Sequence, residues 1–127
     1  MIRGLGVDIV QVERVRQKVG ASFDTPLAKG VFIASELAYA QGKGVAAFQS
    51  LAGFFAAKEA FFKATQVWPG WHGVWVEHEP GGKPYFGLSA EAKEKLRAAG
   101  IDPDAMNLQL TISHEKEYAV AVVVVEG

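Results

Sequence analysis

The segment LAGFFAAKEAFFKA, from Leu51 to Ala64, constrains the fold more than any other part of the chain. It is rich in Ala and Phe, which predicts a helix that is buried over most of its surface. Three charged residues, Lys58, Glu59 and Lys63, are nevertheless set into it. Removing a charge from water costs several kcal/mol unless a partner compensates it. These three side chains therefore need either an exposed surface or a function.

Helical and strand patterns alternate along the rest of the chain. Helices are expected at residues 12–19, 34–41, 45–66 and 89–100, and residues 22–32 are expected to break the helical pattern around Pro26. Strands are expected at residues 2–10, at 74–79 and 83–88 as a hairpin, and at 106–113 and 118–126 as an antiparallel pair. This mixture predicts an α+β fold in which an antiparallel sheet packs on a long central helix. Because no repeat or linker interrupts the pattern, we expect one domain over residues 1–127.

Two strands have unusual sequences. Residues 119–125, AVAVVVV, lack polar alternation, which is typical of a strand that is buried on both faces or that lies in a subunit interface. The first strand contains Gly4 and Gly6, and glycine within a strand indicates a bulge or a close approach of another backbone.

Composition excludes several classes of protein. The formal net charge is −1, which gives no general case for nucleic-acid binding. The chain has no cysteine, so disulfides and thiolate metal sites are excluded. No apolar run is long enough to span a membrane, and residues 1–10 do not resemble a signal peptide. These features fit a cytoplasmic protein.

The charged residues allow two interpretations. Glu59 and Lys63 have the i, i+4 spacing of an ordinary surface ion pair, but their neighbours are almost entirely apolar. Asp8 is similarly isolated in an apolar strand, where it either caps a turn at the strand end or serves a site. Mg²⁺ often takes one or two protein carboxylates and completes its shell with water and phosphate oxygens. Asp8 and Glu59 are therefore candidate ligands, with Lys63 placed to neutralise phosphate charge.

Four segments in order resemble the holo-acyl-carrier-protein synthases, the small phosphopantetheinyl transferases of fatty-acid synthesis. They are GLGVDIVQVERV (4–15), LAGFFAAKEAFFKA (51–64), GKPYF (82–86) and ISHEKEYAVAVVVVE (112–126). The resemblance spans essentially the whole chain, and the combination of G-x-D, F-x-x-K-E-A-x-x-K and S-H is far more specific than any one motif.

The resemblance implies that the chain transfers the phosphopantetheine arm of coenzyme A to a serine of apo-acyl carrier protein. The reaction requires Mg²⁺ and releases adenosine 3′,5′-bisphosphate. By motif match Asp8 and Glu59 hold the metal, and Lys63 neutralises the diphosphate and can protonate the leaving group. The base that deprotonates the serine stays open between Glu59 and a metal-bound water near Asp8.

The same resemblance implies contacts with coenzyme A. His114 of the S-H motif binds a phosphate, Lys58 lies near the phosphates beside Glu59, and Lys83 is a weaker candidate. The family usually has Arg at the position of Phe54, so one phosphate contact is missing here, and Lys43 is a candidate to replace it.

Other polar residues are expected to have structural or ordinary surface roles. Glu36 matches a family position without its usual threonine, and we expect it to be a structural partner. His72 and His78 are expected to be solvated polar residues in turns.

The family also implies partners. It forms homotrimers with active sites between subunits, and an acidic carrier protein docks on a basic first helix, where Arg14, Arg16 and Lys18 supply the charge here. Two alternatives remain. The chain could be a non-catalytic relative that binds coenzyme A or a carrier protein, which the loss of the Arg at Phe54 favours, or a purely structural oligomer.

Overall fold

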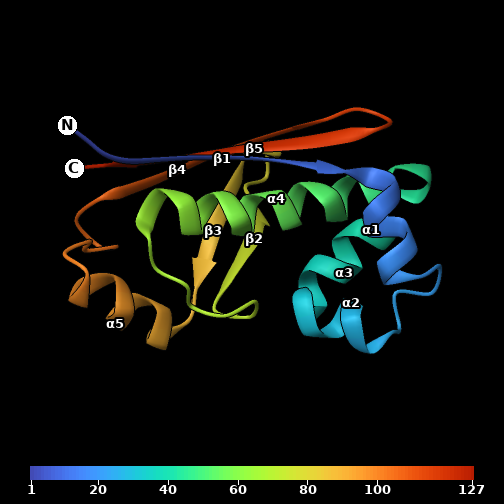
Figure 1. The fold of residues 1–127 in the computed structure, drawn as a ribbon, viewed down its shortest axis with the longest axis horizontal. Helices are drawn as coiled ribbons and strands as arrows, with labels where there is room; N and C mark the ends of the chain where they lie inside the picture. Colours follow the sequence, from blue (N-terminus) through green and yellow to red (C-terminus); the bar gives the residue numbers. More distant parts are fainter.

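The computed structural model describes all 127 residues, and its longest element is the helix α4 (Ala47–Thr65). α4 runs along one face of an antiparallel sheet, and most of its residues are buried (Figure 1). The other elements, in chain order, are β1 (Ile2–Gln11), α1 (Val12–Val19), α2 (Pro26–Val31), α3 (Ala34–Gln41), a 3-10 turn (Gly44–Ala46), β2 (Val74–His78), β3 (Pro84–Leu88), α5 (Ala90–Ala98), β4 (Asn107–His114) and β5 (Tyr118–Glu126).

The main sheet has three strands in the order β1-β5-β4, and every pairing is antiparallel. β2 and β3 form a separate two-stranded hairpin. Helices α1 to α3 gather at one end of α4 and α5 lies toward the other, with the two chain termini side by side (Figure 1). The predicted α+β class, the hairpin, the pairing of β4 with β5 and the helix that begins after Ser89 are confirmed.

The first strand lies unusually close to α4. A Cβ atom at Gly4 would overlap the carbonyl oxygen of Ala64, and one at Gly6 would overlap that of Ala60. Only glycine permits this distance, which confirms the close backbone approach that the sequence predicts. The contact fixes β1 along the helix and brings Asp8 level with the last turns of α4.

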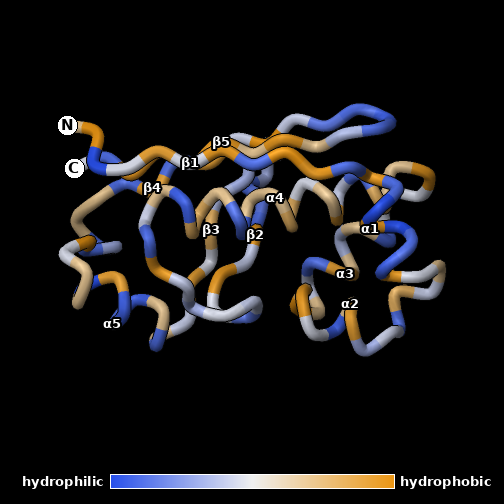
Figure 2. The backbone as a smooth tube through the Cα atoms, in the orientation of Figure 1, coloured by the Kyte–Doolittle hydropathy of each residue, from blue (hydrophilic) through white to orange (hydrophobic).

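The valine-rich strand β5 is the centre of the sheet, and its inward residues Ala121, Val123 and Val125 are fully buried against α4. Its outward valines are only partly buried, and on the neighbouring strand β1 the outward side chains of Leu5, Val7 and Ile9 are more than half exposed. Figure 2 shows β5 as a largely apolar strand that begins at the hydrophilic turn after β4. Of the two expectations for this strand, burial on both faces within one chain is therefore wrong.

Pro26 does not break a helix but begins one. It occupies the first position of α2, and Thr25 caps the helix by accepting a hydrogen bond from the amide of Ala28. The expectation of a helix-breaking segment at 22–32 is wrong because proline is tolerated in the first turn, where its missing N–H needs no acceptor. No helix in the structure has both the length and the apolar character needed to cross a membrane.

Lys58 and Glu36 form a completely buried ion pair, with 2.9 Å between Nζ and Oε1. Glu36 also accepts hydrogen bonds from the amides of Ile33 and Val76. It thus ties the start of α3 to strand β2 and, through Lys58, to α4. Glu36 has the structural role expected of it.

We expect Lys58→Met to lower the free energy of unfolding by about 3–5 kcal/mol, because it leaves the Glu36 carboxylate buried without its counter-charge. Adding Glu36→Gln should recover part of this loss, since no lone charge is then buried. Urea denaturation of the two variants checks both values. A loss below about 1 kcal/mol in the single variant would contradict this description of the pair.

Candidate active site

Asp8 and Lys63 meet where β1 crosses the C-terminal half of α4. The ammonium of Lys63 lies 3.2 Å from Oδ1 of Asp8 and donates a hydrogen bond to the carbonyl oxygen of Val7 at 3.1 Å. Asp8 pairs with Ala121 inside the sheet, so it does not cap a strand end. Lys63 reaches across to the strand, and no ion pair forms between it and Glu59. The interpretation as an ordinary i, i+4 surface pair is therefore wrong.

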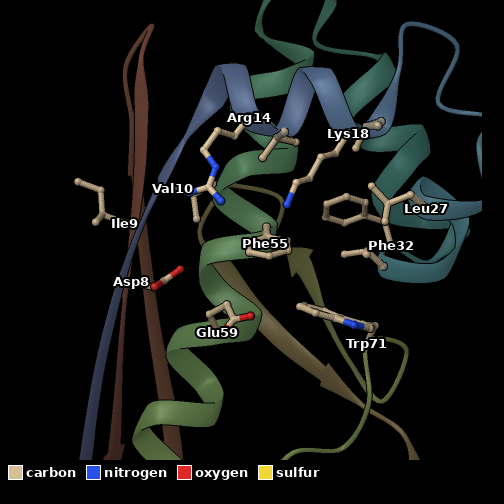
Figure 3. A pocket seen from close by; sticks show the side chains of 13 residues that line it. Asp8, Ile9, Val10, Arg14, Lys18, Leu27, Phe32, Phe55, Glu59 and Trp71 are labelled. Atoms are coloured by element: carbon tan, nitrogen blue, oxygen red, sulfur yellow. The ribbon is translucent and has the colours of Figure 1, made fainter.

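Glu59 lies one turn before Lys63, and Figure 3 shows it on α4 next to the segment of β1 that carries Asp8. Burial raises the pKa of the Glu59 carboxyl, the negative charge of Asp8 raises it further, and Lys63 partly opposes the shift. Two carboxylates close enough to repel each other, with one lysine beside them, form a site with an excess of negative charge.

The donor set of this site suits a hard divalent cation. It offers two carboxylates, and no group of three or more metal-binding side chains occurs anywhere in the structure. Two carboxylates match the protein's usual share of a Mg²⁺ shell when a phosphate substrate supplies the other oxygens. The residues present therefore fit Mg²⁺ held together with a substrate.

A cavity of about 460 Å³ opens beside the two carboxylates (Figure 3). α1 and α2 form one side of it, and α4 and the loop after α4 form the other. Asp8 and Glu59 lie at one end, and Arg14 and Lys18 reach into it from α1. The remaining wall is mainly apolar and includes Leu27, Val31, Phe32, Phe55 and Trp71. The cavity thus has acidic side chains at one end, basic side chains along one edge and an otherwise apolar wall.

A second hollow, of about 150 Å³, lies on a different face of α4. His114 lies on its wall, and its Nδ1 is 2.9 Å from Oε1 of Gln49. Phe54 also lines this hollow, whereas the next residue, Phe55, lines the first cavity. Consecutive helical residues point about 100° apart, which explains the division.

Phe54 belongs to an aromatic cluster in the second hollow. The ring of His78 stacks face to face on Tyr39 at 4.0 Å, and Phe54 contacts both rings. The ammonium of Lys43 lies 4.8 Å from the centre of the Tyr39 ring. Burial lowers the pKa of His78, and the charge of Lys43 lowers it further. Lys43 therefore contacts Tyr39, which in turn packs against Phe54.

The other candidate residues are spread over the structure. Lys83 is exposed, between two residues that line the second hollow. Arg16 is exposed on α1, where it pairs with Glu13 at 3.1 Å and lies over the ring of Phe48, away from the cavity that Arg14 and Lys18 line.

Lys58 requires a correction. The expectation that it lies beside the phosphates is wrong in this structure, because its side chain has no exposed surface and its ammonium points into the core. Burial lowers the pKa of Lys58, and the carboxylate of Glu36 opposes that shift.

Two groups of residues that line these hollows were not identified from the sequence. His78 is part of a stack and not a solvated turn residue, and its only signal was its position on a strand beside the hairpin turn. The apolar wall residues Phe55 and Trp71 looked like ordinary core residues. That they face a cavity is seen only in the structure, where the loop after α4 brings Trp71 next to Phe55.

Comparisons with known proteins agree with this geometry. The model of the 4′-phosphopantetheinyl transferase superfamily matches residues 4–123. The holo-[acyl-carrier-protein] synthase of Acidithiobacillus ferrooxidans is 40% identical over 130 residues, which cover 99% of this chain and 98% of that protein. The synthase of Deinococcus deserti is 38% identical over 136 residues, with coverage of 99% and 98%.

Solved structures extend the similarity to the fold. The holo-[acyl-carrier-protein] synthase of Neisseria meningitidis superimposes with a TM-score of 0.84 at 30% identity over the whole of both chains. That of Helicobacter pylori, in complex with coenzyme A, gives a TM-score of 0.77 at 32% identity and covers 96% of this chain and 99% of that one. With a family match across almost its whole length, the chain belongs to the 4′-phosphopantetheinyl transferase superfamily.

Proposed function

We propose that this protein is a holo-acyl-carrier-protein synthase that acts as one domain over residues 1–127. It transfers phosphopantetheine from coenzyme A to a serine of apo-acyl carrier protein, in the cytoplasm and in the service of fatty-acid synthesis. The observation that carries the proposal is that Asp8 and Glu59, from two segments far apart in sequence, line one cavity, and that Lys63 pairs with Asp8 beside it. Relatives that match over nearly their full length carry the same activity in their names.

In the proposed reaction the hydroxyl oxygen of the carrier serine attacks the phosphorus that bears the pantetheine arm. A new phosphorus–oxygen bond forms, and the bond to the bridging oxygen breaks, so that adenosine 3′,5′-bisphosphate leaves with the bonding electrons. Mg²⁺, held by Asp8 and Glu59, would supply the positive charge that neutralises the diphosphate.

Lys63 contributes a second positive charge and can give a proton to the leaving phosphate. Its side chain is half exposed and its ammonium is hydrogen-bonded to Asp8, so Lys63 is held at the edge of the site and is still accessible. The serine proton needs an acceptor, which would be either the carboxylate of Glu59 or a metal-bound water near Asp8.

We assign the second hollow to the nucleotide part of coenzyme A. His114 and Lys43 would contact phosphate, Lys83 would assist from the hairpin turn, and the stacked rings of Tyr39 and His78 offer an aromatic surface. This hollow and the carboxylate site occupy different faces of α4.

A homotrimer would bring the two sites together. Ser50 lines the hollow and Glu59 the carboxylate site, and these residues lie roughly 13 Å apart along the helix. An active site between subunits combines the carboxylates of one copy with the hollow of its neighbour. The apolar residues on the outer face of β1, Leu5, Val7 and Ile9, supply a surface suited to such an interface.

We assign the first cavity to the carrier protein. Arg14 and Lys18 lie on its edge and would attract an acidic partner, with Arg16 adding charge to the same helix from outside the cavity. The apolar wall would accept a side chain close to the modified serine, which has to approach Asp8 and Glu59. Charge would thus guide docking, and apolar contact would hold the carrier in place.

We expect apo-acyl carrier protein, incubated with this protein, coenzyme A and Mg²⁺, to gain the mass of one phosphopantetheine. A chelator should abolish the gain, and Glu59→Gln should lower the rate at least about 100-fold, since the variant loses a ligand of the metal. Mass spectrometry of the carrier measures both results. No gain with the wild-type protein would contradict the proposal and favour a non-catalytic relative. Activity near the wild-type rate in Glu59→Gln at saturating Mg²⁺ would exclude Glu59 as a ligand.

We further expect Glu59→Gln to raise the melting temperature of the metal-free protein by about 2 °C at pH 8. The pKa of Glu59 is raised in the folded state, so its ionised form destabilises the fold above that pKa. The gain should vanish as the pH falls below 4.5, where the carboxyl is protonated in the folded and unfolded states alike.

In the presence of coenzyme A, adding Mg²⁺ should further stabilise the wild-type protein in a saturable way and have little further effect on the variant, which still has the second hollow for coenzyme A. Thermal unfolding with a chelator alone, with a chelator and coenzyme A, and with Mg²⁺ and coenzyme A measures these effects. A Glu59→Gln variant that melts below the wild type at pH 8 in chelator would contradict the electrostatic description of the site.

A further inference from the structure

We propose that Lys58 is a positioning residue for carrier-protein docking, because its buried ammonium holds together the two walls of the first cavity. The inference rests on the proposed function, since it assigns that cavity to the carrier. Lys58 itself has no exposed surface and does not line the cavity. It would act on the carrier only through the residues that it holds.

The ammonium of Lys58 is at the centre of three contacts. It donates to the carbonyl oxygen of Val31 at 2.8 Å, to that of Trp71 at 2.6 Å and to Oε1 of Glu36 at 2.9 Å. An ammonium has three N–H donors, so all of its donors are used. No other residue type offers the same three donors from one atom at this depth.

Two of these contacts reach opposite walls of the cavity. Val31 is the last residue of α2, and Trp71 lies in the loop after α4, 40 positions further along the chain. Both residues line the cavity, and both are held through their backbone carbonyls. Lys58 thus fixes two separate segments to the same turn of α4.

The held segments carry the large apolar side chains of the wall. The ring of Trp71 packs against Phe55 at 5.2 Å, and Phe32, the residue after Val31, has its ring 5.7 Å from the Lys58 ammonium. Figure 3 shows Phe32, Phe55 and Trp71 facing the same space. Without the ammonium, the buried carbonyl of Val31 and the partly buried carbonyl of Trp71 lose their donor, and the cost of leaving them unsatisfied favours movement of both segments toward water.

Lys58 and Glu59 are consecutive residues that point in different directions. Glu59 faces the carboxylate site, and Lys58 faces the core behind the cavity. One turn of α4 therefore sets both the position of the metal ligand and the shape of the proposed docking surface. A change at Lys58 should impair binding of the carrier and leave binding of coenzyme A, on the other faces, largely intact.

The test compares the wild-type protein with the double variant Lys58→Met/Glu36→Gln, which removes both buried charges and reduces the risk of unfolding. Leu96→Ala is a matched control, because it creates a cavity in the separate core cluster around α5 and destabilises the protein without touching the docking surface. Rates are measured well below the melting temperature of each protein. Carrier is varied at saturating coenzyme A, and coenzyme A is varied at saturating carrier.

We expect the double variant to raise KM for the carrier about tenfold or more, with KM for coenzyme A changed less than about twofold. The control should leave both values near those of the wild type. If the double variant leaves KM for the carrier unchanged, or if the control raises it equally, Lys58 has only a structural role and the inference is wrong. A rise confined to KM for coenzyme A would also overturn it. No product from the wild-type protein would instead overturn the proposed function, and the inference with it.

Discussion

The close contact between β1 and α4 is the constraint on which the rest of the structure depends. Gly4 and Gly6 allow the strand to lie against the backbone carbonyls of Ala60 and Ala64, where any side chain would collide. Since β1 pairs with β5 in one register from Gly4 to Gln11, the sheet and the helix are fixed together. This register is what places Asp8, two residues after Gly6, beside the last turns of the helix. The pairing of Asp8 with Lys63 thus depends on the absence of two Cβ atoms.

The three charges in the apolar helix have two different functions. Glu59 lines a cavity beside Asp8, where burial raises the pKa of Glu59, and Lys63 pairs with Asp8. Lys58 faces the interior, where Glu36 and two carbonyls satisfy it. The helix tolerates the two lysines because each has partners on the side toward which it points, and it tolerates Glu59 because this side chain is only partly buried. Its apolar residues meanwhile form the spine on which the sheet and the smaller helices pack.

The sequence predicted those features whose signals are local. Helix caps, hairpin turns and antiparallel pairs depend on neighbouring residues, and the candidate carboxylates stood out because each was isolated among apolar residues. The direction of the Lys58 side chain could not be predicted, because its partner Glu36 lies 22 positions away in the sequence and is brought to it only by tertiary packing. The Tyr39–His78 stack could not be predicted for the same reason, since it joins two separate elements, α3 and β2. Pro26 alone is ambiguous, because proline occurs both where helices end and where they begin. The preceding Thr25, which caps α2, is the sequence signal that favours a helix start.

The candidate polar residues lie on different faces of α4, and this separation is the physical argument for an active site shared between subunits of the proposed trimer. Asp8 and Glu59 lie at one cavity, and His114 lies at a hollow on another face, so coenzyme A would meet both sets most simply between two copies of the chain. Mixing the variants Glu59→Gln and His114→Ala tests this shared site most directly. Each variant alone should transfer phosphopantetheine poorly at limiting coenzyme A. Co-expressed, they should regain about a quarter of the wild-type rate, because random assembly joins an intact Glu59 to a neighbour's intact His114 at about one interface in four. A mixture no more active than its parents would contradict an active site shared between subunits.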